Sequence, residues 1–547
     1  MSVERSLHDS LSTSATMPTF RRKMSQNEIS YFLPSRAYGL NDMFTRLIFR
    51  APPALVSPFR LRVVWAIMRL RHSLMACRFE MAPGCYDHAQ FVYTPPANAN
   101  AALAETNATV RMFDDVTGPE LMQSFLSGQR TLSADRLAML HVANHGEVSL
   151  GTNEYHLLVM FHHGINDSLA VMRTIHLMVG LLCGPGVPGG APRTDAELSK
   201  VLDDEWGVRW ATPRDPGDVI VPATEARILG LPRSKIAEAA WKVDHKCLQE
   251  RAIGGHVFPK LLKNRVAKAR IFQVKFSIEQ TNAIRDKCKA ERVTPQNVVF
   301  GLCNMAWMRL CANHPEIDAP KTLPMLMYTS VSIRRYLNPV SPLSSYMSLA
   351  LDYCNVVLPA YLSTSVDPRA VFWARSREAQ RQMFGYTHSP LLLRRAVTTS
   401  AARGKRAKAF ARADDAADGT LPPLPPPSAS IPPSPPSAPS LALIGVSQIG
   451  SIDPIFDQSA YPAVELVDIV GGVRKAPGGI TLFSRTFLGR FNMTLVWDAA
   501  AFKPGLMEEF WRGVVDGVHE FVLGDPSGRA EELEPTAMAP VGVKSRL

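Results

Sequence analysis

The sequence lacks several features that would assign the protein to a class at once. Its 547 residues contain no uncharged apolar stretch of about eighteen or more, the length that a membrane-spanning helix requires. The first thirty residues contain no apolar segment typical of a signal peptide. The eight cysteines are scattered singly, without a C-x-x-C pair, which argues against a zinc ribbon and a disulfide scaffold. We therefore expect a reducing compartment, no transmembrane segment and no bound metal.

Acidic residues are too few to balance the basic ones, and the net charge of +11 raises the question of a nucleic-acid partner. Two basic clusters, within 260–270 and 403–412, supply much of the excess. Neither is interleaved with aromatic residues that could stack on bases, and no nucleic-acid-binding signature accompanies them. We interpret both clusters as solvated charge and expect no nucleic-acid partner. Attraction for an anionic substrate stays open.

The length suits two to four domains or one large protein of two lobes, because 547 residues exceed one ordinary core. Residues 1–30 are polar, and we expect a flexible arm there. Residues 31–184 are expected to form an N-terminal lobe. In it, hydrophobic spacing predicts a helix over 61–72, a hairpin over 147–163 and a helix over 168–182.

The remaining chain is divided by changes in composition. Residues 185–270 are punctuated by Pro and Gly and are expected to be a crossing linker. A C-terminal lobe is expected over 271–400 and 441–530, interrupted at 401–440 by a disordered, Pro-rich insertion. Residues 531–547 are expected to be a flexible tail.

Local signals predict the elements that open the second lobe. Ser277 and Gln280 have the spacing of a capping box, and Thr294 is followed by Pro295 at the first position of a helix. A strand is predicted just before Ser277, and the last strong helical pattern runs over 507–522. Both lobes therefore repeat a strand followed by a long helix.

One group of residues carries chemistry: His162 and His163 follow a buried strand, and Asp167 and Ser168 begin the next helix. Neighbouring strand residues point to opposite faces, so the two histidines are poorly placed to bind one metal ion. One imidazole can instead project into a cleft as a general base, with the acid bracing the turn. The alternative is two core histidines beside a helix that Asp167 or Ser168 merely caps.

The pattern H-H-x-x-x-D-S resembles the H-H-x-x-x-D-G signature of the condensation-domain and acyl-CoA-dependent acyltransferase superfamily. This superfamily includes chloramphenicol acetyltransferase, carnitine acyltransferases and mycobacterial polyketide-associated acyltransferases. Other segments are similar to the superfamily in the same order, namely 61–79, 277–308, 331–334, 446–450 and 491–498. The resemblance covers most of residues 35–525.

The resemblance implies an α/β (α+β) fold of two chloramphenicol-acetyltransferase-like lobes, with a tunnel at their interface. It implies that His163 is the general base and that Asp167 pairs with Arg334 from the other lobe. His162 would support the site, and Ser447 is a weaker candidate for stabilising an oxyanion. The alternative for Ser447 is a serine that only forms a turn. The implied co-substrate is acyl-CoA, with a hydroxyl-bearing acceptor and no bound cofactor.

Two features depart from the superfamily pattern. Ser168 replaces the signature glycine and adds a side chain beside the tunnel. The absence of a D-F-G-W-G motif disfavours the plant and trichothecene branch, and the absence of a carrier-protein domain disfavours a multimodular synthetase.

The chain ends in Ser545-Arg546-Leu547, which matches the small–basic–Leu form of a peroxisomal address, so we expect a peroxisomal import receptor as a partner. Together with the motif, this ending is similar to the peroxisomal acyltransferases of fungal mannosylerythritol-lipid biosynthesis. We predict an O-acyltransferase that moves a short or medium acyl chain from CoA to a sugar or polyol hydroxyl. The alternatives are an alcohol or wax-ester-type acyltransferase with an apolar acceptor, and a non-catalytic binding protein of the same fold.

Overall fold

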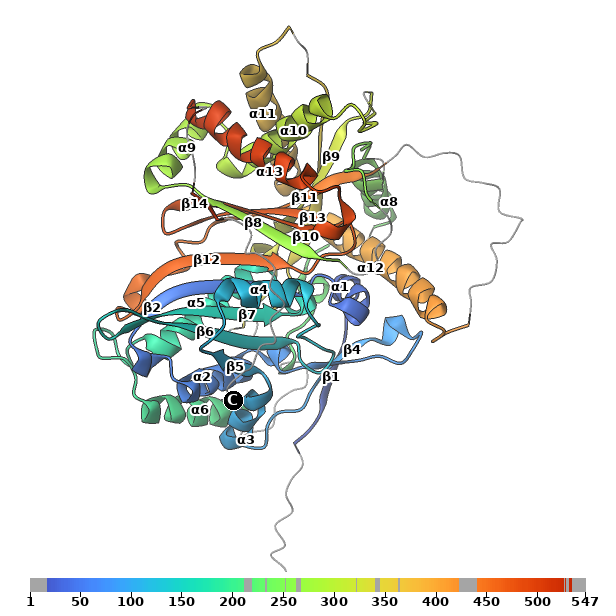
Figure 1. The fold of residues 1–547 in the computed structure, drawn as a ribbon. Coiled ribbons are helices and arrows are strands. Elements are labelled where there is room, and N and C mark those ends of the chain that lie inside the picture. The colour runs from blue at the N-terminus through green and yellow to red at the C-terminus, as the bar shows by residue number, and fades with distance from the viewer. Residues whose placement is uncertain are drawn as a thin grey trace, which may run out of the picture.

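Two lobes, each built on its own β-sheet, are stacked on one another (Figure 1). The mixed α/β fold of two lobes agrees with the sequence prediction. The computed structural model describes residues 17–210, 219–231, 234–250, 252–261, 267–320, 322–339, 345–362, 365–422, 440–525, 527 and 531–533.

The N-terminal lobe contains a sheet of strand order β12-β2-β7-β6-β5. Its strands are β12 (Glu465–Val473), β2 (Met43–Ala51), β7 (Thr152–Phe161), β6 (Ala138–Ser149) and β5 (Val110–Phe113). The lobe's helices are α1 (Gln26–Tyr38), α2 (Pro58–Arg71), α3 (Ala99–Glu105), α4 (Gly118–Ser127), α5 (Ser168–Cys183) and α6 (Asp195–Trp210). Helix α2 packs on one face, where Trp65 meets Phe161, and α4 packs on the other, where Phe125 meets Phe44. The predicted hairpin is β6 and β7, and both predicted helices are present.

A small sheet of order β1-β4-β3 lies beside this lobe, with strands β1 (Phe20–Lys23), β4 (Gln90–Tyr93) and β3 (Arg78–Glu80). Helix α1 follows β1 and begins with a complete capping box of Ser25 and Glu28. The prediction of a flexible arm over 1–30 is therefore wrong from residue 20 onward. Polar composition concealed a capped helix whose Ile29 and Phe32 are buried.

The C-terminal lobe contains a sheet of strand order β10-β9-β11-β13-β14-β8-β15. Its strands are β10 (Leu351–Leu358), β9 (Met325–Ser332), β11 (Ala442–Ser451), β13 (Ile480–Phe487), β14 (Arg490–Asp498), β8 (Ala269–Lys275) and β15 (Glu531–Leu533). Helices α9 (Ile278–Ala290), α10 (Pro295–Asn313), α11 (Pro368–Thr387) and α13 (Leu506–Gly517) lie on the outer side of this sheet (Figure 1). The predicted capping box of Ser277 and Gln280 and the Thr294 cap are both present.

Two domain boundaries differ from the prediction. Strand β12 lies within the segment 441–530, which was assigned to the C-terminal lobe, yet it pairs antiparallel with β2 of the other lobe. A strand's composition does not specify which sheet edge it joins, so this crossing leaves no local signal. The predicted linker over 185–270 is also partly structured, because α6 packs against α2 and α8 (Lys235–His245) packs against α12 (Leu392–Ala417).

The prediction of a disordered insertion over 401–440 is wrong for its first part. Residues 401–417 complete α12, which lies beside α1 (Figure 1). Ala and Arg are strong helix formers, and small residues on one side of α12 allow close packing. At Gly404 a side chain would stand 2.3 Å from the Oε1 atom of Gln26. The proline-rich residues 423–439 lie outside the described part of the chain.

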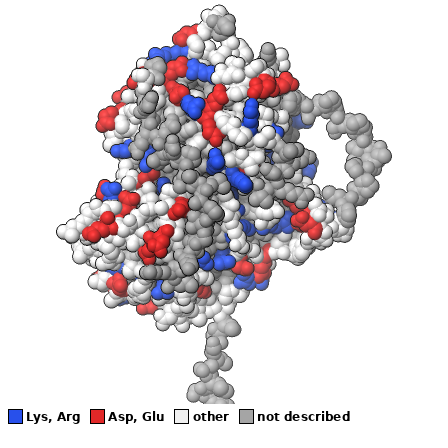
Figure 2. Space-filling view, viewed as in Figure 1, with Lys and Arg blue, Asp and Glu red and all other residues white. Residues whose placement is uncertain are grey.

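Surface charge is mixed on the face shown in Figure 2, where Lys and Arg side chains are interspersed with Asp and Glu. Two described residues of the basic clusters have acidic partners: Lys408 contacts Asp87, and Arg270 contacts Glu508. Within the described ranges, no helix has both the length and the apolar character to cross a membrane.

Candidate active site

The site begins where β7 ends. His162 and His163 follow Phe161, a short turn follows them, and Asp167 caps the N-terminus of α5 by accepting a hydrogen bond from the Ala170 N–H at 3.0 Å. The two histidines diverge as predicted, although both lie beyond the end of β7 and His163 begins a short 3₁₀ turn. His162 is buried, with 1% of its surface exposed, whereas the half-buried His163 lines a cavity.

His163 is held with one ring nitrogen free. Its Nδ1 lies 3.1 Å from the carbonyl oxygen of Asn166, which can only accept, so Nδ1 carries the proton and Nε2 keeps its lone pair. The ring stacks on Tyr31 at a centroid distance of 4.2 Å. Burial lowers the pKa of His163 to about 4, because the charged imidazolium is poorly solvated there. His163 is therefore neutral at neutral pH, as a general base must be.

His162 uses both ring nitrogens inside the protein. The Gly164 N–H donates to Nδ1 at 2.9 Å, so Nε2 carries the proton and faces the Ser35 hydroxyl at 2.8 Å. That hydroxyl in turn donates to the Phe32 carbonyl. Burial lowers the pKa of His162 well below its usual value. This neutral ring supports the turn that carries His163 and has no nitrogen left for substrate.

This geometry predicts a stabilising role for His162. His162→Ala should lower the free energy of unfolding by about 1–3 kcal/mol, because the Gly164 N–H and the Ser35 hydroxyl both lose a buried partner. Urea denaturation would measure the loss. His388→Ala, on the exposed end of α11, is the control and should change stability by less than about 0.5 kcal/mol. Equal stability of His162→Ala and wild type would contradict the assigned role.

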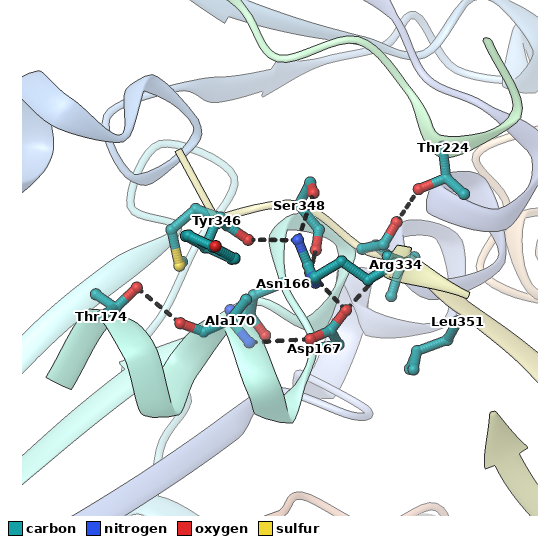
Figure 3. A network of polar contacts seen from close by, with 12 residues as sticks. Asn166, Asp167, Ala170, Thr174, Thr224, Arg334, Tyr346, Ser348 and Leu351 are labelled. Atoms are coloured by element: carbon teal, nitrogen blue, oxygen red, sulfur yellow. Dashed lines mark hydrogen bonds and ion pairs between the residues drawn. The ribbon is translucent and has the colours of Figure 1, made fainter. Parts of the chain in front are cut away.

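Asp167 and Arg334 form a buried ion pair between the lobes (Figure 3). Arg334 Nη2 donates to Asp167 Oδ2 at 2.7 Å, and the same oxygen accepts from the Ala350 N–H at 3.1 Å. Arg334 also donates to the carbonyl oxygens of Tyr346 and Ser348. Only 1% of Asp167 and 6% of Arg334 is exposed. The structure thus brings together the two residues that the resemblance implied, and their bonds fix the start of α5 against the second lobe.

The cavity beside His163 has a volume of about 410 Å³ and is lined by both lobes. Tyr31, Asp167 and Ser168 line it from the first lobe, and Tyr328 and Ser447 line it from the second. The signature position Ser168 thus places its side chain on the cavity wall. All five predicted site residues lie at or directly behind this cavity. Within the described ranges, no cluster of three or more His, Cys, Asp or Glu side chains could hold a metal ion.

The architecture is shared with solved structures of low sequence identity. The trichothecene 15-O-acetyltransferase of Fusarium sporotrichioides is similar with a TM-score of 0.66 and 11% identity, covering 95% of this chain and 99% of that one. Polyketide synthase associated protein 5 of Mycobacterium tuberculosis has a TM-score of 0.54 and 14% identity, covering 92% and 100%. The condensation domain of the monacolin K polyketide synthase has a TM-score of 0.53 and 11% identity, covering 93% of this chain and 99% of that one. The chain has the condensation-domain fold.

No protein-family model matches the sequence, and no curated protein matches it either. The condensation-domain fold is therefore established by the structure rather than by sequence identity. This sequence lacks the D-F-G-W-G motif, yet its fold is similar to that of a trichothecene acetyltransferase. The absence of the motif therefore does not exclude a shared fold.

The cavity residues that sequence reasoning missed include Tyr31, Arg403 and Lys475. Arg403 was assigned to solvated charge in an unfolded segment, but it lies on α12 and faces the cavity. The small residues on one side of α12 were the available signal, since the helical spacing of Ala396, Gly404, Ala407 and Ala411 marks a buried face. Burial lowers the pKa of Lys475 to about 7, and its ammonium group donates to Thr481.

Proposed function

We propose that the protein is an O-acyltransferase that moves an acyl group from acyl-CoA to a hydroxyl group of an acceptor. The observation that carries this proposal is the neutral His163, whose unprotonated Nε2 belongs to a ring that lines the cavity between the lobes. The condensation-domain fold supports it, because the trichothecene 15-O-acetyltransferase, a protein named for acetyl transfer, shares this fold.

The proposed reaction needs one base and no metal. Nε2 of His163 takes the proton of the acceptor hydroxyl while the hydroxyl oxygen attacks the thioester carbon. The tetrahedral intermediate then collapses, the C–S bond breaks, and His163 returns the proton to the sulfur. The products are an ester and free CoA thiol. Ser447 is proposed to donate to the oxyanion, and Asp167 with Arg334 would hold the turn in place without moving protons.

The acceptor is proposed to be polar, of the sugar or polyol class, with mannosylerythritol in glycolipid biosynthesis as the specific case that the sequence resemblance favours. Polar side chains along the cavity support this class over an apolar alcohol, namely Ser330, Ser332, Gln448, Lys475 and Thr481. An apolar wax-ester-type acceptor would offer these side chains no hydrogen-bonding group, although Lys475 already donates to Thr481 and Gln448 to the Gln296 carbonyl.

A thiol-release assay tests the proposal. Purified full-length protein would be incubated with acyl-CoAs of increasing chain length and with sugars, polyols and simple alcohols, and free CoA thiol would be measured. Acceptor-dependent thiol release is expected, with polyols preferred over aliphatic alcohols. Preference for aliphatic alcohols would favour the wax-ester alternative. Binding of acyl-CoA without thiol release under any condition would favour the binding-protein alternative and overturn the proposal.

The lowered pKa of His163 predicts the pH dependence of the reaction. Protonation removes the lone pair that accepts the hydroxyl proton, so kcat/KM should fall as the pH drops through the pKa. With that pKa near 4, the acid limb should be centred near pH 4, and kcat/KM should be flat above about pH 6. An ordinary histidine would place the midpoint near 6.5. A pH–rate profile for thiol release measures it, and a midpoint at or above 6.5 would contradict the expected environment of His163.

We also propose a peroxisomal location, based on Ser545-Arg546-Leu547, which lies outside the described residues. An N-terminal fluorescent fusion should appear in puncta with a peroxisomal marker, because the import receptor reads a free C-terminal tripeptide. Removing these three residues should release the fusion to the cytosol. A diffuse full-length fusion in cells with working import would contradict the location and leave the acyltransferase proposal intact.

A further inference from the structure

Arg403 reaches the catalytic cavity from α12. Its guanidinium carbon lies 4.0 Å from the ring centroid of Tyr353 and 5.2 Å from that of Tyr31. The same Tyr31 ring stacks on His163 at 4.2 Å. Tyr31 and Tyr353 are themselves joined by a hydrogen bond between their hydroxyls. The guanidinium of Arg403 is therefore close enough to His163, the proposed base, for one small acceptor molecule to contact both.

The positive charge of Arg403 is not matched by a carboxylate in the cavity. Among the described residues that line the cavity, Asp167 carries the one carboxylate, and Arg334 already binds it. Asp352 neighbours Tyr353 on β10, so its side chain points to the other face of the sheet, where it accepts a hydrogen bond from Tyr386 at 2.8 Å. A second amine, Lys475, lines the same cavity.

Other arginines show how this chain satisfies a buried guanidinium. Arg395, two turns earlier on α12, binds both carboxylate oxygens of Asp244, at 2.6 and 2.8 Å. Arg403 instead has a buried Nε without a hydrogen-bond partner in the described part of the chain. Its contacts with aromatic rings are attractive but supply no acceptor for its N–H donors. Within the described ranges no carboxylate or carbonyl oxygen accepts from the Arg403 guanidinium, and because Arg403 lines the cavity it can donate to a ligand bound there.

We propose that Arg403 binds a carboxylate of the acceptor, so that the acceptor is an acidic member of the proposed sugar or polyol class, that is, a hydroxy acid. This inference rests on the proposed function, because it places a second group of the same acceptor. The acyl donor is a poor source of the charge, since the thioester end of acyl-CoA is neutral and its phosphates lie at the far end of the pantetheine arm. A guanidinium and a carboxylate make two parallel, charge-assisted hydrogen bonds, which would orient the acceptor hydroxyl toward His163.

The test compares acceptors that differ only in this charge. A panel of hydroxycarboxylic acids, each paired with its methyl ester, would be assayed by thiol release with one acyl-CoA and full-length protein. In the wild type, kcat/KM for an acid should exceed that for its ester by about ten- to a hundredfold. Arg403→Met should bring this ratio close to one, and Arg403→Lys should keep part of it. Lys405→Met, an exposed residue of the same helix, should leave the ratio unchanged.

Two results would overturn the inference: equal use of acids and esters by the wild type, or an unchanged ratio in Arg403→Met. Thiol release with neutral alcohols alone would also overturn it and leave the proposed function standing. If no acceptor of either kind supports thiol release, the proposed function fails. The inference about Arg403 is then tested by the binding of a hydroxy acid, measured as a change in Tm. A hydroxy acid should then raise the Tm of wild type but not of Arg403→Met; an equal rise, or none, overturns it. If Arg403→Met does not fold, Arg403→Lys replaces it in both comparisons.

Discussion

His163→Ala is expected to lower kcat for thiol release by about two to four orders of magnitude while the protein stays folded. The Nε2 atom of His163 is the proposed acceptor of the hydroxyl proton, and alanine supplies no such nitrogen at this position. The loss should appear in kcat more than in the KM for acyl-CoA, because the base acts on the acceptor. Few contacts are lost: one hydrogen bond to Asn166 and the stack on Tyr31. The Tm should therefore change by only a few degrees.

Two histidine variants separate the chemical role of His163 from a structural one. His176→Ala changes another half-buried histidine on the helix that follows the motif, and it should keep near-wild-type turnover. His162→Ala should lose stability but less activity than His163→Ala, because its nitrogens bind Gly164 and Ser35 rather than substrate. Equal turnover of His163→Ala and wild type would contradict the proposed mechanism.

The elements around the motif could be predicted because short-range rules specify them. Apolar alternation specified the hairpin of β6 and β7, and the spacing of Ser277 and Gln280 specified the start of α9. Strand alternation predicted that His162 and His163 diverge, but both lie beyond the end of β7, and the turn that begins at His163 sets their directions. Such signals involve residues close in sequence, so they can be interpreted without knowledge of the tertiary fold.

The missed features depend on contacts between distant segments. The prediction of disorder over 401–440 missed the second half of α12, because the buried face of that helix is made of small residues rather than large apolar ones, and it packs against α1. Arg403 was read as solvated because charge in a polar segment is usually solvated. Strand β12 joins the sheet of the other lobe through its register with β2, which no local pattern encodes. The cavity is built at these junctions, so its acceptor-binding side could not be derived from local sequence.

Asp167→Asn is expected to lower the free energy of unfolding by about 3 kcal/mol and to lower turnover as well. The substitution keeps the helix cap, since asparagine is as good a cap as aspartate and can still accept from the Ala170 N–H. It removes the negative charge that faces Arg334 at 2.7 Å and the oxygen that accepts from the Ala350 N–H, in a position where both side chains are almost fully buried. Turnover should fall because this pair fixes the first turn of α5, directly after His163, against the second lobe.

A double-mutant cycle decides whether the two residues act as partners. Adding Arg334→Met to Asp167→Asn removes the uncompensated positive charge, so part of the stability should return while the activity stays low. Urea denaturation of the two single variants and the double variant gives the coupling energy. The exposed pair of Glu378 and Arg381 is the matched control, and its cycle should give a coupling below about 1 kcal/mol because water screens it. Strictly additive losses at Asp167 and Arg334 would show that the buried pair does not hold the lobes together, and the positioning of His163 would then depend on the turn and its Asn166 hydrogen bond alone.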